Sequence, residues 1–234
     1  MKFYSAVLKG WHQSIQTPLN HAYKGTLTRR RTSCVTAVLA SLLIMTGQAQ
    51  ANPSPAPSER ETAVHPVRGF LPDLNFTLQG ANNKTYTEAD FSGKVVLMFF
   101  GYASCPDICP TTMAQLSHVM QALGTQASDV RILFVSVDPH RDTPDILQAY
   151  VNAFDAQHAI GLTGTEQQIA QLARRYRVAY QIEKPKEGSA DTYEVAHSRG
   201  IYMFDKQGKA RLLASDGESV DALTKGVQSI LALK

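Results

Sequence analysis

Cysteine, long apolar runs and repeated segments are all scarce in this chain of 234 residues. Only three cysteines are present. The apolar run from Cys34 to Met45 is about 12 residues long, whereas a membrane-spanning helix needs about 20, so this run is too short to cross a bilayer. No segment repeats at a fixed period, which excludes a repeat architecture.

The N-terminal segment has the three parts of a secretory signal peptide. Arg29, Arg30 and Arg31 precede the apolar run, and the small residues of Ala49-Gln50-Ala51 follow it. We therefore expect residues 1–51 to be a signal peptide that is cleaved after Ala51, and the mature protein to be periplasmic. A short uncleaved anchor is the alternative.

The net charge changes once this segment is removed. Six of the 23 Lys and Arg residues lie in residues 1–51, and none of the 20 Asp and Glu residues do. The remaining chain carries 17 basic against 20 acidic residues, a net charge of −3. It has no basic patch with interleaved aromatic residues, so the composition predicts no nucleic-acid partner.

The rest of the chain is predicted to be a linker and one domain. Residues 52–69 are rich in Pro, Ser and Ala at their start and lack periodicity, which is typical of a linker, and residues 70–234 have the length of one domain. We expect strands at 74–78, 84–86, 95–100, 130–137, 197–204 and 210–213, and helices at 111–123, 143–154, 165–176 and 219–233. This order predicts an α/β fold: a mixed central sheet flanked by helices, with an N-terminal hairpin.

Two cysteines directly follow the buried strand predicted at 95–100. Cys105 and Cys109 lie where a helix begins, and there the helix dipole favours thiolate over thiol. If both are helical, they share one face with Cβ atoms roughly 5–6 Å apart, which suits two ligands of one metal and permits a disulfide with modest movement. The three intervening residues leave more room for an ion than the two of a thioredoxin motif.

His197 is the candidate third ligand. It precedes a strand that we expect to return beside the strand at 95–100. Two thiolates and one imidazole suit copper, and zinc with an added water is chemically allowed. The residues alone leave a metal-free thiol–disulfide oxidoreductase as the alternative. A peroxidase is disfavoured because Tyr102 occupies the position where that class carries an activating threonine.

Three acidic residues and one methionine near these motifs have two interpretations each. Asp138 and Asp142 could interact with ligand groups or docking partners, or serve in turns and helix caps. Asp107 is expected to complement the dipole in the first turn of its helix rather than to bind metal. Met203 is a soft ligand type, but its apolar strand predicts a place in the core.

The segment Phe99–Pro110 resembles the copper motif of the Sco/SenC proteins. Further stretches fit that family in the same order: Val137-Asp138-Pro139, Arg141-Asp142-Thr143-Pro144, Gly161-Leu162-Thr163-Gly164 and Tyr193 to Ser198. The resemblance covers the chain from about Phe70 onward. In the common family form an aspartate precedes the histidine, and this chain has Ala196 there.

This resemblance implies a thioredoxin-like fold and a copper ion held by Cys105, Cys109 and His197. The ligand set suits Cu(I), and the sequence leaves open whether Cu(II) is also held. It implies a metallochaperone for the binuclear copper centre of cytochrome c oxidase. Such proteins donate copper, reduce the cysteines of the acceptor, or do both. The implied partners are a respiratory oxidase subunit as copper acceptor and a thiol reductant. We expect a monomer.

Overall fold

The structure is a computed structural model that describes residues 64–67, 69, 71–183 and 193–233. The predicted signal peptide, residues 1–51, lies outside the described residues and stays a prediction. The same holds for most of the predicted linker, but Val64–Pro66 of that linker form a short strand, β1, at the edge of the sheet.

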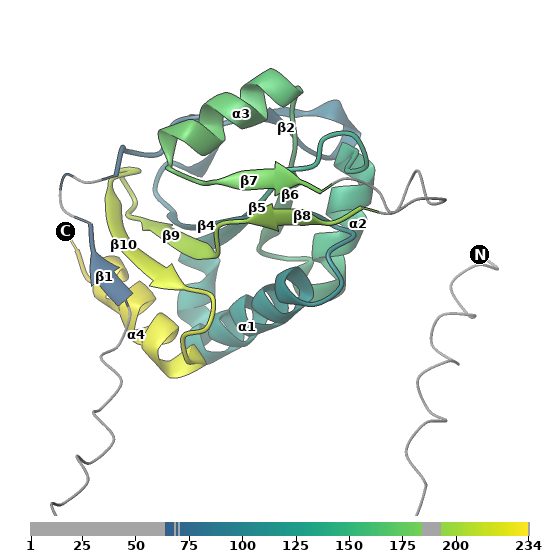
Figure 1. Ribbon diagram of the computed structural model, residues 1–234. Helices are drawn as coiled ribbons and strands as arrows, with labels where there is room; N and C mark the ends of the chain where they lie inside the picture. Colours follow the sequence, from purple (N-terminus) through teal and green to yellow (C-terminus); the bar gives the residue numbers. More distant parts are fainter. Residues whose placement is uncertain (1–63, 68, 70, 184–192, 234) are drawn as a thin grey trace, which may run out of the picture. The chain divides into compact units, whose positions relative to one another are not determined.

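The described residues form a six-stranded central sheet in the order β1-β10-β9-β4-β5-β6 (Figure 1). The strands β4, β5 and β6 are parallel, β9 pairs antiparallel with β4, and β10 pairs antiparallel with β9, so the predicted mixed sheet is confirmed. Their bounds are β4 Val95–Gly101, β5 Val130–Ser136, β6 Ala159–Leu162, β9 Gly200–Phe204 and β10 Ala210–Ser215. Every residue of β4 is buried, as its unbroken apolar run predicts for a strand covered on both faces.

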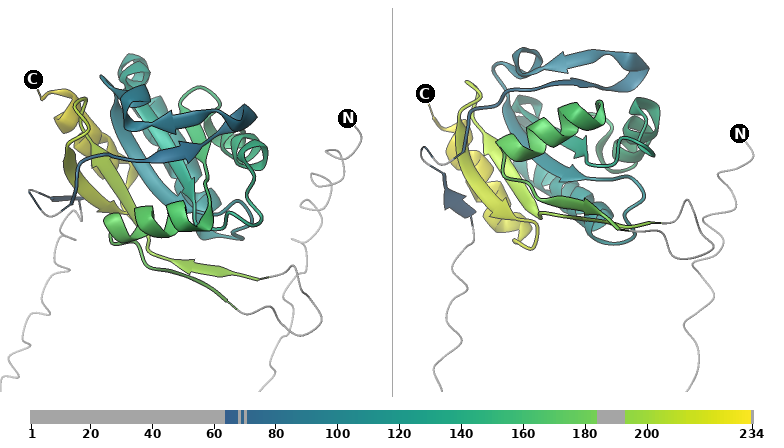
Figure 2. Two further views of the ribbon diagram at one scale, coloured as in Figure 1. Left: turned by 90° about the horizontal axis from the view of Figure 1, so that it is seen from above. Right: turned by 45° about the horizontal axis from the view of Figure 1, so that its top comes forward.

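Four helices cover the two faces of this sheet (Figure 2). They are α1 Ile108–Leu123, α2 Pro144–Asp155, α3 Glu166–Arg175 and α4 Val220–Leu231. Successive strand residues point to opposite faces. Met203 therefore faces α4, whereas its neighbour Tyr202 packs on the ring of Tyr176, the residue that ends α3. Among the described residues, no helix has the length and apolar character needed to cross a membrane.

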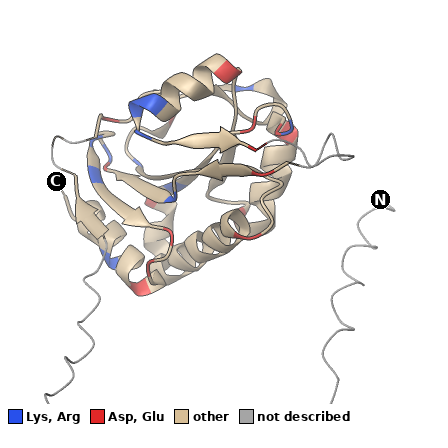
Figure 3. Ribbon diagram, in the orientation of Figure 1, with Lys and Arg blue, Asp and Glu red and all other residues tan. Residues whose placement is uncertain are grey.

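Capping residues explain where two of the helices begin. The Thr143 hydroxyl accepts a hydrogen bond from the Ile146 amide, with Pro144 in the first turn of α2. Thr165 and Gln168 form a reciprocal capping box at the start of α3, as the sequence predicts. Basic and acidic residues are interspersed over the elements (Figure 3), and α3 has acid in its first turn and arginines in its last, which complements the helix dipole.

Two small antiparallel ribbons lie beside the main sheet. The predicted N-terminal hairpin is formed by β2 (Thr77–Gln79) and β3 (Thr85–Thr87). The second ribbon pairs β7 (Tyr180–Ile182) with β8 (Val195–His197). The short 3-10 helices are η1 Ala81–Asn83, η2 Glu88–Phe91 and η3 Gly124–Asp129.

The second ribbon corrects one prediction, because the single strand predicted at 197–204 is two strands. β8 ends at His197, and β9 begins at Gly200 in the main sheet. Between them, Ser198 exchanges hydrogen bonds with Ala179: its amide donates to the Ala179 carbonyl at 2.8 Å, and its hydroxyl accepts from the Ala179 amide at 2.9 Å. This break leaves His197 at the end of the ribbon, above the sheet that β9 then joins.

Candidate metal centre

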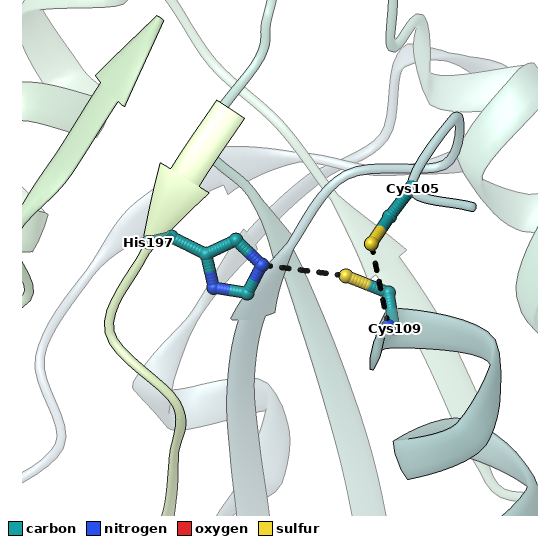
Figure 4. A group of neighbouring side chains, drawn as sticks. All are labelled: Cys105, Cys109 and His197. Atoms are coloured by element: carbon teal, nitrogen blue, oxygen red, sulfur yellow. Dashed lines mark hydrogen bonds between the residues drawn. The ribbon is translucent and has the colours of Figure 1, made fainter. Parts of the chain in front are cut away.

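The structure brings Cys105, Cys109 and His197 together, as the sequence predicts. One ligand atom from each lies within 4.8 Å of the others. Figure 4 shows the three side chains converging from the turn after β4, from the start of α1 and from the end of β8. In the described parts of the chain, this is the only group of three His, Cys, Asp or Glu residues with metal-binding spacing.

The two cysteines are not both helical. Helix α1 begins at Ile108, three residues before the predicted start, and Asp107 stands at its N-cap position rather than in its first turn. Cys109 is therefore in the first turn of α1, and Cys105 precedes the helix. The first N–H groups of a helix have no partner within the helix, and the N–H of Cys109 is one of them. It points at the Cys105 sulfur, 3.5 Å away.

His197 presents an unprotonated nitrogen to the cysteines. Its Nδ1 donates to the Ser198 carbonyl oxygen at 3.0 Å, and a neutral imidazole then has its lone pair on Nε2. Burial lowers the pKa of His197, which favours that neutral form. Nε2 lies 3.5 Å from the Cys109 sulfur, so the ligand nitrogen points into the group.

The two thiols differ in their environments. Cys105 is partly exposed: burial raises its pKa, but hydrogen bonds from the amides of Cys109 and Asp107 and from the Tyr102 hydroxyl outweigh it, so the pKa is lowered. Cys109 is buried, and that burial raises its pKa well above the usual range of a thiol. Cys105 is thus the more available thiolate of the pair.

We expect Cys105 to be alkylated well before Cys109 in the reduced protein. A lowered pKa leaves Cys105 as thiolate at a pH where an ordinary thiol is still protonated, and only the thiolate is nucleophilic. Brief treatment with iodoacetamide over a range of pH, followed by peptide mass spectrometry, would measure both rates. Equal rates at the two cysteines would contradict this picture of the pair.

Gly101 closes β4 directly beneath the sulfur of Cys109. A Cβ atom at this position would lie 2.8 Å from the Cys109 sulfur and 2.9 Å from the Phe134 ring. Such contacts are closer than real Cβ atoms allow, so any side chain here must displace one of these groups. The sequence offered a signal that our predictions did not use, since a glycine at a strand end often marks close approach of another group.

Replacing Gly101 with alanine is accordingly expected to destabilise the protein by about 1–3 kcal/mol, the usual effect of overpacking a filled core. The same change should move Cys109 away from His197. Chemical unfolding would measure the first effect and a crystal structure of the variant the second. An unchanged unfolding midpoint would contradict this expectation, because it would mean that a Cβ atom fits between Gly101, Cys109 and Phe134.

Of the two interpretations given for Asp138 and Asp142, the turn role fits the structure, because the Asp138 carbonyl accepts hydrogen bonds from the amides of Arg141 and Asp142. Asp138 and Asp142 are 0% and 1% exposed, so neither can dock a partner. Asp142 accepts hydrogen bonds from the Ala103 amide at 3.0 Å and from the Ser136 hydroxyl at 2.6 Å, and burial raises its pKa. It thereby fixes the loop that leads to Cys105. Met203 lies in the core, 1% exposed, as predicted.

Comparison with known proteins decides the family. Residues 71–232 match the family model described as SCO1/SenC. The chain belongs to the SCO1/SenC family. The resemblance seen in the sequence is thus confirmed, and the α/β architecture fits the thioredoxin-like fold of Sco structures.

Three similar proteins illustrate the match. The bovine mitochondrial SCO2 homolog is 37% identical over 160 residues, which are 68% of this chain and 59% of that protein. The structure of Bradyrhizobium japonicum ScoI with copper bound is 34% identical with a TM-score of 0.61, covering 68% of this chain and 98% of that one. Yeast Sco1 with copper bound is 30% identical with a TM-score of 0.57, covering 68% and 90%. The match thus spans less than two thirds of the bovine protein.

Proposed function

We propose that this protein is a periplasmic copper-binding metallochaperone. It delivers copper to a copper enzyme, such as the binuclear copper centre of cytochrome c oxidase, or reduces the cysteines of that enzyme, or does both. The observation that carries the proposal is the group of two sulfurs and one imidazole nitrogen within 4.8 Å. The copper bound in the two related structures supports the same metal.

The donor set fits copper better than zinc. Cu(I) is soft and accepts two thiolates and one imidazole, whereas a structural zinc site is almost always four-coordinate. The nitrogen of His197 is already unprotonated, and the Cys105 thiolate is favoured. The two cysteines and His197 would hold the ion, and Cu(II) is the second form we expect there.

The placement of the site suits transfer of the ion. Cys105 and His197 line an open cleft of about 370 Å³, while Cys109 lies buried behind them. A partner that enters this cleft could replace Cys105 and His197 first and Cys109 last. The periplasmic location rests on the signal-peptide pattern of residues 1–51 alone.

Copper transfer to an acceptor tests this proposal. The Cu(I)-loaded protein would be mixed with the reduced, metal-free copper domain of an oxidase subunit. Samples taken over time would be oxidised with ferricyanide by one electron per binuclear site, because two Cu(I) ions are colourless, and the centre would then be measured by its visible absorption. We expect the centre to form faster than with the same amount of Cu(I) held by a chelator of matched affinity. A protein that binds no copper, or that retains it beside the acceptor, would contradict the delivery role.

The unequal thiols support a second candidate, a metal-independent thiol–disulfide oxidoreductase. The Cys105 thiolate would attack a substrate disulfide and release one thiol, and Cys109 would then displace the second thiol as the Cys105–Cys109 disulfide forms. A thiol reductant would restore both cysteines. Because His197 takes no part in this exchange, turnover of a disulfide substrate that is unaffected by His197→Ala would favour this candidate over the copper site.

A further inference from the structure

Arg141 makes three contacts with groups near the site. Its guanidinium lies 3.6 Å from the centre of the Tyr193 ring, and its Nη1 donates to the Tyr193 carbonyl oxygen at 2.9 Å. Its Nε is paired with Oδ2 of Asp138 at 2.5 Å. Arg141 lies in the loop after β5, and Tyr193 lies two residues before β8, so these contacts join segments 52 residues apart.

Asp138 completes the attachment of Tyr193. Its carboxylate is fully buried, and while Oδ2 pairs with Arg141, Oδ1 accepts a hydrogen bond from the Tyr193 hydroxyl at 2.8 Å. The Arg141–Asp138 ion pair therefore holds Tyr193 at three points. Arg141 contacts its ring and its carbonyl oxygen, and Asp138 accepts from its hydroxyl. His197 lies four residues further along the chain, at the end of β8.

The same loop also reaches the cysteine side of the site. The guanidinium of Arg141 lies 5.5 Å from the ring centre of Tyr102, three residues before Cys105. The edge of that ring meets the ring of His197, with centroids 6.1 Å apart and planes at 88°. Arg141 thus contacts one aromatic ring on the cysteine loop, Tyr102, and one on the segment that leads into β8, Tyr193.

We propose that Asp138, Arg141 and Tyr193 form a clasp that positions His197 against the two cysteines. The inference rests on the proposed copper function and adds to it the residues that set the affinity. The strand β8 is three residues long and pairs with β7 outside the main sheet, so contacts beyond strand pairing must fix its position. Residues that orient a metal ligand in this way typically change metal affinity 10–100-fold when they are replaced.

Two variants weaken the clasp without removing a metal ligand. Arg141→Lys keeps the positive charge, but an ammonium group lacks the plane with which the guanidinium stacks on the Tyr193 ring while donating hydrogen bonds. Tyr193→Phe removes only the hydroxyl that donates to Asp138. The matched control is Arg211→Lys. Arg211 lies on strand β10, and its Nε also pairs with a buried aspartate, Asp205, at 2.5 Å. We expect Cu(I) affinity, measured by competition with a chelator, to fall 10–100-fold for both clasp variants and to stay unchanged in the control.

A double-mutant cycle shows whether the clasp acts through the histidine. In a His197→Ala background the clasp has no third ligand to position, so Arg141→Lys should lower the affinity no further. The absorption of the Cu(II) form should also shift in Arg141→Lys toward that of His197→Ala. An equal loss of affinity with and without His197, or an equal loss in the Arg211→Lys control, would overturn the inference.

A metal-free measurement separates the clasp from the copper function. Amide hydrogen exchange at Val195, Ala196 and His197 should be faster in Arg141→Lys than in the unaltered protein and unchanged in Arg211→Lys. Unchanged exchange in Arg141→Lys would overturn the clasp. An unaltered protein that binds no Cu(I) would overturn the proposed function, and the exchange rates would still decide the clasp.

Discussion

Replacing Cys109 with serine is expected to lower the Cu(I) affinity of the protein on the order of a thousandfold. Structural zinc in zinc-finger peptides, held by four ligands, binds with about 10–16 kcal/mol, so one ligand of a comparable site accounts for up to about 4 kcal/mol, and each 1.4 kcal/mol is tenfold. Serine offers a hard oxygen in place of a soft sulfur. Competition titration with a Cu(I) chelator would measure the change.

The matched control for this variant is Met203→Leu. It also removes a sulfur near the sheet, but the Met203 side chain is buried in the core, 1% exposed, and faces α4. A swap of similar volume should cost less than about 1.5 kcal/mol of stability and leave Cu(I) affinity unchanged. If Cys109→Ser still bound Cu(I) as tightly as the control, the ligand assignment would be wrong.

Replacing Asp138 with alanine is expected to lower the free energy of unfolding by about 3 kcal/mol. The variant leaves Arg141 without its charge partner and the Tyr193 hydroxyl without its acceptor. Breaking a buried ion pair from one side costs about 3–5 kcal/mol, and Arg141 keeps 21% of its side-chain surface exposed, which favours the lower value. Urea denaturation followed by circular dichroism would measure the change.

A second aspartate provides the comparison. Asp129 also pairs with basic residues, Lys94 at 3.4 Å and Lys206 at 2.8 Å, but all three side chains are at least a third exposed. Exposed pairs contribute little because water and salt screen them, so Asp129→Ala should change stability far less than Asp138→Ala. Similar losses in the two variants would show that burial does not govern these ion pairs.

The grouping of the three candidate ligands could be predicted from the sequence largely because the signals of the two cysteines are local. Cys105 lies between β4 and α1, and Cys109 lies in the first turn of α1, so a spacing of four residues brings the two sulfurs together. The apolar runs that became β4 and β5 identified the parallel core of the sheet in the same way. His197 needed one further step, the expectation that its strand returns beside β4, and β9 does so directly after it.

The remaining features depend on contacts between distant segments. Strand β6 is four residues long, with a glycine at its third position, and β7 and β8 have three residues each; such lengths carry no periodic signal. The clasp joins Asp138 and Arg141 to Tyr193, more than 50 residues away. Their sequences predict turn and surface roles, and only the fold shows that the two segments meet.

The measurement that tests the central claim most directly is a Cu(I) titration of the reduced protein beside its His197→Ala variant, in competition with a chelator. We expect one tightly bound Cu(I) per protein and a sharp loss of affinity in the variant, since two sulfurs alone would then hold the ion. Absence of binding, or an affinity that does not depend on His197, would contradict the three-ligand copper site and favour the disulfide exchange of Cys105 and Cys109.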